Sequence, residues 1–161
     1  MTELGPEARA LADRMYEPRG YIHEWHLYLA QRRPEVLDHW EQLTRTANRT
    51  SALPPRYREC VYVGVLSAIG EEDAARNHMH KALDHGATEE ELLDAVLAAF
   101  NPTGAITMVH GVRALVEVLQ ERGLYELPEV PYRVTDRAAD AGRGYLEDKR
   151  TLRMDEPTTD T

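Results

Sequence analysis

The amino-acid sequence predicts an all-α fold. Alternating runs of β-branched residues, which would indicate strands, are absent, whereas helical periodicity recurs along most of the chain. Prolines, glycines and one capping pattern divide these periodic stretches into about six to seven helices. The length of 161 residues, with 42% hydrophobic and 29% charged residues, fits one globular helical domain.

The first part of the chain contains four expected helices. They cover about 6–16, 21–32, 34–49 and 55–69. Pro18 ends the first of them, while Pro34 and the pair Pro54-Pro55 open the third and the fourth. Proline is favoured in the first turn of a helix because its fixed φ suits that position and its missing N–H has no partner there.

Three further helices are expected after a break at Gly70. They cover about 72–85, 89–100 and 105–122. Gly86 follows the first of these as a cap in the left-handed region. Thr88 and Glu91 form a capping-box pattern at the start of the second. The segment 101–104, Asn-Pro-Thr-Gly, is expected to break that helix before the last one begins.

Two regions of different composition suggest the domain organisation. Residues 1–123 are expected to form a single helical domain. Residues 124–161 are rich in charge and proline, and we interpret them as an extended C-terminal arm that lies on the body or on a neighbouring subunit. For the part after about residue 150, a frayed end is the simpler interpretation.

Charge and cysteine content exclude several functional classes. The net charge of −9 and the absence of a basic stripe argue against nucleic acid as the main partner. A single cysteine cannot form an intramolecular disulfide. No apolar run approaches the ~18 residues that span a bilayer, and the N-terminal stretch lacks the apolar core of a signal peptide. We therefore expect a cytoplasmic protein without a membrane partner.

The stretch "RECVYVGVLSAIGEEDAARNHMH" carries the strongest candidates for chemistry. Glu59 lies in a helix that is apolar nearly all round, where a carboxylate is costly unless it is paired or neutral. The break at Gly70 makes a helical hairpin, in which Glu59 can meet His78 and form a pair able to transfer a proton. Two alternatives remain: Glu59 only complements the helix dipole in the first turn, or the pair is a structural salt bridge.

Other histidines are weaker candidates. His110 lies in a helix that is apolar on most sides, where a hydrogen-bonded core histidine is the more common case. His26 shares an apolar stripe with Ile22 and Leu29 and is expected to point inward. His23 and His26 are spaced to bind one metal together. No metal motif supports that alternative, and the sequence predicts no metal site.

Three stretches together resemble the carboxymuconolactone decarboxylase family, whose superfamily also holds the AhpD-like alkylhydroperoxidases. They are "LPPRYRECVYVGVLSAIG", "NHMHKALDHGATEEELLDAVLAA" and "NPTGAITMVHGVRALVEVL". The resemblance covers about residues 53–119 well and extends more weakly to "RGYIHEWHLYLAQRRPEVLDHWEQL". It implies an AhpD-like helical bundle, a pocket near a subunit interface, and self-association to a trimer or hexamer.

The redox branch of that family carries a glutamate, a Cys-x-x-Cys pair and a histidine at fixed spacing. On this chain the glutamate falls on Glu59 and the histidine on His78, whereas the two cysteine positions hold Glu71 and Ala74. Cys60 has no resolving partner and does not replace the motif. A dithiol peroxidase cycle within one subunit is therefore rejected.

The remaining resemblance implies a cofactor-independent, decarboxylase-like lyase for a small carboxylated lactone or related organic acid. His78 would donate the proton and Glu59 would orient it or exchange the proton. Glu71 is a secondary candidate, although an exposed acid at a helix start is the simpler interpretation. Other pocket candidates are His110, His26, Arg56, as a cation for the substrate, and Gly104, as part of a backbone anion site.

Two other functions remain open on the same scaffold. One is a hydrolase or isomerase of a lactone or β-keto compound. The other is a non-catalytic binding protein that kept the fold. No metal or organic cofactor is expected, because a substrate with its own electron sink does not require one.

Overall fold

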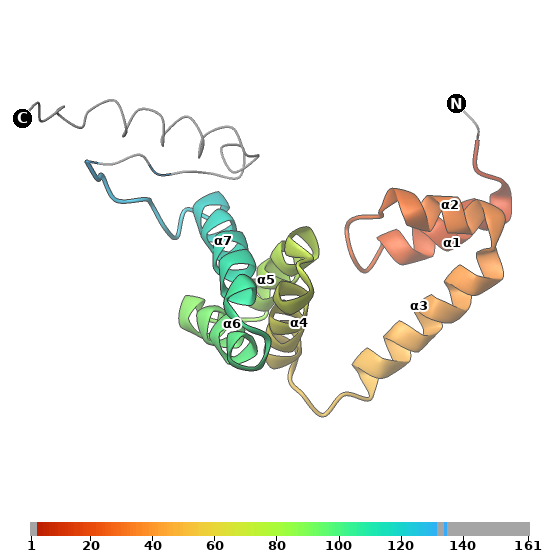
Figure 1. Ribbon diagram of the computed structural model, residues 1–161. Helices are drawn as coiled ribbons and strands as arrows, with labels where there is room; N and C mark the ends of the chain where they lie inside the picture. The colour runs from red at the N-terminus through yellow and green to blue at the C-terminus, as the bar shows by residue number, and fades with distance from the viewer. Residues whose placement is uncertain (1–2, 132–133, 135–161) are drawn as a thin grey trace, which may run out of the picture. The chain divides into compact units, whose positions relative to one another are not determined.

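The computed structural model describes residues 3–131 and 134, and these residues form an all-α fold (Figure 1). Within this part of the chain there are seven helices and no strand. The helices are α1 Pro6–Tyr16, α2 Glu24–Arg32, α3 Pro34–Arg49, α4 Pro55–Ile69, α5 Glu72–Asp84, α6 Glu89–Thr103 and α7 Ala105–Glu121. The fold class predicted from the sequence is confirmed.

Most helix boundaries follow the local signals in the sequence. Proline occupies the first turn of α1, α3 and α4. Gly70 ends α4 in the left-handed region, with φ of 78°, which glycine adopts without steric cost. The capping box at α6 forms as expected: the Thr88 hydroxyl accepts the Glu91 N–H at 3.1 Å, and the Glu91 carboxylate accepts the Thr88 N–H at 3.1 Å.

Two boundaries differ from the prediction. Helix α2 begins at Glu24 instead of residue 21, because His23 is extended and its backbone N–H donates to Nδ1 of His26 at 3.0 Å. Helix α6 continues through Pro102 and ends at Thr103, so the expected break at residue 101 is wrong. A proline here deprives only the carbonyl of Ala98 of its partner, and that residue is exposed, so water can replace the lost donor.

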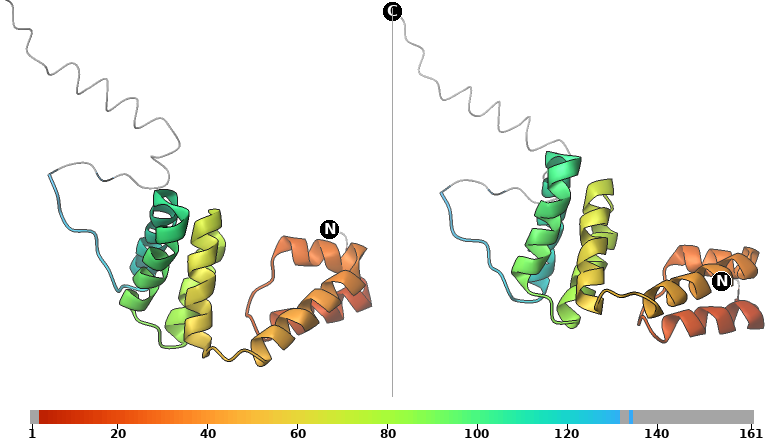
Figure 2. Two further views of the ribbon diagram at one scale, coloured as in Figure 1. Left: turned by 60° about the horizontal axis from the view of Figure 1, so that its bottom comes forward. Right: turned by 90° about the horizontal axis from the view of Figure 1, so that it is seen from below.

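Helices α4, α5, α6 and α7 pack against one another as one bundle (Figures 1 and 2). Its core is made of small and medium apolar side chains, among them Val63, Ala75, Met79, Leu92, Val96, Ala114, Leu115 and Val118. Gly111 of α7 allows a close approach: a Cβ there would lie 2.5 Å from Val96 Cγ1 and 2.8 Å from Ser67 Oγ. The bundle is therefore packed around a position that admits no side chain.

Among the described residues, nothing covers one face of α7. The sequence indicates a helix that is apolar on most sides, and part of that apolar surface is exposed here. Thr107, Ala114 and Val118 are fully buried, whereas Ile106 and Val109 remain exposed.

Helices α1, α2 and α3 have a small core of their own. It consists of Ala8, Leu11, Met15, Ala30 and Leu37. Side-chain hydrogen bonds connect this group with the bundle: Lys81 of α5 donates to the Tyr21 hydroxyl at 2.9 Å, and Arg58 of α4 donates to the carbonyl of Asn48 at 3.3 Å. The space between these contacts holds the candidate site.

The chain divides into two units after Glu121, close to the boundary at residue 123 that the sequence predicts. The predicted arm lies in the second unit, and most of it, residues 132–133 and 135–161, falls outside the described residues. None of the helices described is long and apolar enough to cross a membrane.

Candidate functional site

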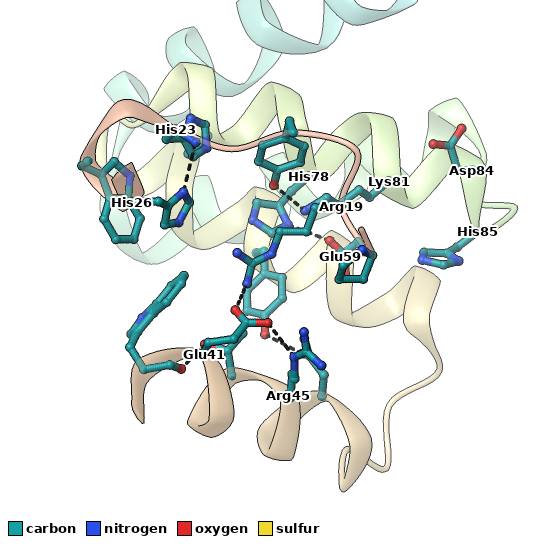
Figure 3. A pocket seen from close by; sticks show the side chains of 18 residues that line it. Arg19, His23, His26, Glu41, Arg45, Glu59, His78, Lys81, Asp84 and His85 are labelled. Carbon is teal, nitrogen blue, oxygen red and sulfur yellow. Dashed lines mark hydrogen bonds and ion pairs between the residues drawn. The ribbon is translucent and has the colours of Figure 1, made fainter. Parts of the chain in front are cut away.

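A pocket of about 900 Å³ lies between α2, α3 and the segment that connects α1 to α2 on one side, and α4 and α5 on the other (Figure 3). Its lining is rich in charged and aromatic groups. The lining residues used below are Arg19, Tyr21, His23, Trp25, His26, Trp40, Glu41, Arg45, Glu59, Tyr62, Ala74, His78, Lys81 and His85. Two of them, Glu59 and His78, are the pair that the sequence singled out.

Glu59 and His78 meet across the hairpin of α4 and α5. Nδ1 of His78 lies 2.6 Å from Oε2 of Glu59, which is the distance of a strong, charge-assisted hydrogen bond. Glu59 is only 6% exposed, whereas the His78 side chain is about one-quarter exposed and lines the pocket. The register of the hairpin thus buries the acid and presents the imidazole to the pocket.

The charge state of Glu59 follows from its surroundings. Burial alone would raise the pKa of this carboxyl. The hydrogen bond from His78 and the positive charges of His78, Lys81 and Arg58 outweigh that effect, so the pKa lies below its ordinary value. Glu59 is therefore ionised at neutral pH and acts only as an acceptor.

This ionisation sets the orientation of the imidazole. Because the Glu59 carboxylate has no proton to give, Nδ1 of His78 must be the donor in the hydrogen bond between them. Nε2 is then the ring nitrogen that can take a proton from a bound molecule or return one to it. The ring of Tyr62 packs against the imidazole, with 4.8 Å between the centroids, and restricts its rotation.

The helix-dipole alternative for Glu59 does not apply. Glu59 is the fifth residue of α4, and the first turn of this helix contains no acid. Its carboxylate is held by the contact with His78 and by Arg58, whose Nε lies 3.9 Å from Oε1.

The other candidates from the sequence are only partly brought to the pocket. His26 lines it, and Ala74, which stands at a family cysteine position, does so as well. Glu71 is exposed at the start of α5 and is not part of the lining. Of the two positions that hold cysteines in the redox branch of the family, only that of Ala74 therefore lines the pocket.

Three further candidates lie outside the pocket lining. Arg56 pairs with Glu91 at 3.4 Å and packs over the ring of Tyr57. His110 lies 3.8 Å from Glu72, between α7 and α5. Gly104 is exposed where α6 ends.

The cations of the pocket are residues that the sequence did not single out. They are Arg19, Arg45 and Lys81. Lys81 follows His78 by three residues, so helical periodicity places both on one face, and this signal was available in the sequence. Arg19 could not be identified as a pocket residue from the sequence, because it lies between two helices and reaches the pocket only through the packing of α1 to α3.

Arg19 and Arg45 share one buried acid as their ion-pair partner. Glu41 is 2% exposed and accepts hydrogen bonds from Arg19 and, at 2.7 Å, from Nε of Arg45. Lys81 instead donates to a phenol, the Tyr21 hydroxyl. Among the cations of the lining, Lys81 is therefore the one whose described hydrogen bond goes to a neutral group, while its charge acts on the nearby Glu59 carboxylate.

A metal site at His23 and His26 receives no support from the geometry. Nδ1 of His26 is occupied by the His23 backbone N–H. In residues 3–131 and 134, no three side chains of His, Cys, Asp or Glu form a group able to hold a metal ion. Cys60 is buried, which raises the pKa of its thiol, and it is not part of the pocket lining.

The fold and the site define a class of protein: an all-α bundle with a buried Glu–His pair that opens onto a polar pocket. The comparison with protein families agrees with this class, since the model of the carboxymuconolactone decarboxylase family matches residues 34–117, more than half of the chain. The chain belongs to the carboxymuconolactone decarboxylase family. The expected AhpD-like, all-α bundle is confirmed. No curated protein and no solved structure was found to match.

Proposed function

We propose that the protein is a cofactor-independent lyase that removes carbon dioxide from a small carboxylated lactone or a related organic acid. The observation that carries this proposal is the 2.6 Å contact between Glu59 and His78 at the wall of an open pocket. A structural salt bridge would not need to face a pocket, whereas an acid–base pair must reach a substrate.

The chemistry divides into bond cleavage and proton transfer. When the bond to the carboxylate breaks, its electron pair remains on the substrate and is delocalised into a neighbouring carbonyl as an enolate, while carbon dioxide leaves. Nε2 of the protonated His78 then delivers a proton to the carbon that lost the carboxylate. Water restores the proton on His78, so the net reaction consumes one proton and forms one C–H bond.

Glu59 supports this step without contacting the substrate. Its carboxylate fixes the imidazole through Nδ1 and stabilises the imidazolium form. It is a positioning residue, and its negative charge is the feature that matters. Proton transfer by a positioned side chain contributes about 10²- to 10⁴-fold to a rate, which sets the expected loss in variants of His78.

Lys81 supplies the cation that an anionic substrate requires in this acidic chain. It lies one turn beyond His78 on α5, and its ammonium is held at the pocket by the Tyr21 hydroxyl. A substrate carboxylate paired with Lys81 would lie next to the imidazole. This role replaces that of Arg56, which is engaged with Glu91.

Self-association belongs to the same proposal. Three apolar side chains of α4, at positions i, i+4 and i+8, form an exposed stripe: Val61, Val65 and Ile69 are 52%, 55% and 66% exposed. Exposed Ile106 and Val109 add apolar surface on α7. We expect a trimer or hexamer to cover such surface, because isolated apolar stripes of this kind are typical of subunit interfaces.

The test follows the ultraviolet absorbance of γ-carboxymuconolactone with the wild type, His78→Ala and the matched control His80→Ala. His80 lies on the same helix but pairs with Glu121 outside the pocket lining. We expect turnover by the wild type and the control, and a loss of about 10²- to 10⁴-fold in His78→Ala. If the wild type also fails on other lactones and β-keto acids, a non-catalytic binding role replaces this proposal.

A further inference from the structure

One end of the pocket is lined by aromatic rings, of which the proposed reaction uses only Tyr21, through its hydroxyl. The rings are those of Tyr21, His23, Trp25, His26 and Trp40. Trp25 lies 3.7 Å from His26 between ring centroids, and Trp25 meets Trp40 edge-to-face at 5.2 Å. In Figure 3 His23 and His26 lie at one side of the pocket, and Asp84 and His85 at the other.

His26 carries an unmet hydrogen-bond donor at this end. The His23 backbone N–H donates to Nδ1 of His26 at 3.0 Å, so Nδ1 bears no proton and the ring is neutral with its proton on Nε2. Nε2 is buried and has no hydrogen-bond partner among the described residues, and His26 as a whole is only 2% exposed. An unpaired buried N–H destabilises a folded protein, and a ligand with an acceptor oxygen would remove that cost.

The two indoles are positioned to admit such a ligand. The chain contains two tryptophans, Trp25 and Trp40, and they are 42% and 40% exposed. Tryptophan side chains are highly buried on average, so this degree of exposure is unusual. Arg19 lies over the ring of Trp40 at 5.4 Å, and its pairing with Glu41 keeps it there. Both indoles therefore present part of their surface to solvent beside His26, whose ring centroid lies 3.7 Å from that of Trp25.

The aromatic end lies mostly outside the matched part of the family. The family model begins at residue 34, so it includes the Glu59–His78 pair but not Tyr21, His23, Trp25 or His26. The reactive end of the pocket thus lies within the matched segment, while most of this end is supplied by the preceding segment. Differences in substrate choice are expected to arise where a chain adds its own pocket residues.

We propose that the aromatic end is a specificity subsite for a flat, conjugated ring, which packs against Trp25 and Trp40 and places an acceptor oxygen on the Nε2–H of His26. The inference rests on the proposed function only in assigning this ring to the substrate of the Glu59–His78 pair. A saturated, puckered ring presents no flat face to the indoles and loses the stacking contribution.

The experiment uses benzoate as the flat probe and cyclohexanecarboxylate as the matched saturated probe. Both are titrated into the full chain labelled with ¹⁵N at tryptophan, and the two indole N–H resonances are followed by NMR. We expect benzoate to shift both resonances and to bind about two- to tenfold more tightly than cyclohexanecarboxylate. Equal affinity for both acids, or no shift with either, would overturn the subsite without the need for any variant.

Variants then test the donor. His26→Phe keeps a flat ring but removes the N–H, and we expect benzoate to bind about two- to tenfold more weakly. His26→Gln retains an N–H donor and is expected to restore part of the affinity, while His39→Phe on the exposed side of α3 serves as the matched control. Unchanged affinity in a folded His26→Phe would contradict the assigned role of Nε2.

The subsite and the proposed reaction fail in different ways. His80→Ala, outside the pocket lining, should leave the indole shifts and the benzoate affinity unchanged. Binding of flat rings without turnover of any acid would retain the subsite and remove the lyase. Turnover of an acid by a wild type that shows no preference for flat rings would retain the lyase and remove the subsite.

Discussion

At the residue scale, the central feature is a buried carboxylate whose cost is offset by one histidine. Glu59 lies in an apolar helix and stays ionised because His78, Lys81 and Arg58 surround it with positive charge. Helical periodicity and the break at Gly70 showed that Glu59 and His78 could meet, and the family resemblance favoured this pair over the alternatives. They could not predict Arg19, Glu41 or Trp40, because these residues reach the pocket through the packing of α1 to α3, for which the sequence carries no local signal.

His26 yields a pH prediction at the same scale. Burial, together with the positive charges of Arg19 and His23, lowers its pKa from 6.5 to about 4. Between these values the unfolded chain binds the proton and the folded protein does not. The free energy of unfolding must therefore fall as the pH falls from 6.5 toward 4.

The full pKa shift of His26 corresponds to a loss of at most about 3 kcal/mol in the free energy of unfolding, at 1.36 kcal/mol per pKa unit. Urea unfolding at a series of pH values measures it, and NMR titration of the ring should show His26 neutral at pH 5. His26→Phe should flatten the profile in this range. A titration of His26 near its ordinary pKa would contradict the assigned burial and tautomer.

At the element scale, the α4–α5 hairpin and the α6–α7 pair were predictable from capping residues, whereas the continuation of α6 through Pro102 was not. Proline is an ambiguous signal near a helix end, because the cost depends on whether water can reach the carbonyl that loses its partner. Ala98 is exposed, and this exposure is a property of the packed bundle. Local sequence therefore located the elements better than their ends.

Gly111 provides the element-scale prediction. A Cβ at this position would lie within 3 Å of Val96 and Ser67, which join α7 to α6 and α4. We expect Gly111→Ala to destabilise the fold by about 1–3 kcal/mol, despite the better helix propensity of alanine. Gln120→Ala, at an exposed position of α7, should change stability by less than about 0.5 kcal/mol in the same urea experiment. A stabilised Gly111→Ala would refute the close packing.

At the scale of the whole molecule, the described chain leaves an apolar stripe on α4 and apolar side chains on α7 without cover. The sequence indicates that α7 is apolar on most sides, and the described residues bury only part of that surface. A neighbouring subunit is the cover that the family resemblance implies. The surface of α4 could not be assigned from the sequence, because this helix is apolar nearly all round and its periodicity does not show which face remains outside.

Val65→Glu tests this expectation. A charge in the middle of the stripe should reduce the molar mass measured by light scattering after size-exclusion chromatography, since burying an unpaired carboxylate is costly. Leu43→Glu, at another exposed apolar position on α3, is the matched control. A wild type that is monomeric, or an unchanged mass in the Val65→Glu variant, would remove the α4 stripe as a subunit interface.

The most direct test of the central claim, that Glu59 and His78 act as one acid–base unit, is a double-mutant cycle on the decarboxylation rate. The rates of the wild type, Glu59→Gln, His78→Ala and the double variant are measured on the same substrate. If Glu59 acts only through His78, the double variant is no slower than His78→Ala alone. Losses that multiply in the double variant would show two independent roles and would contradict the account.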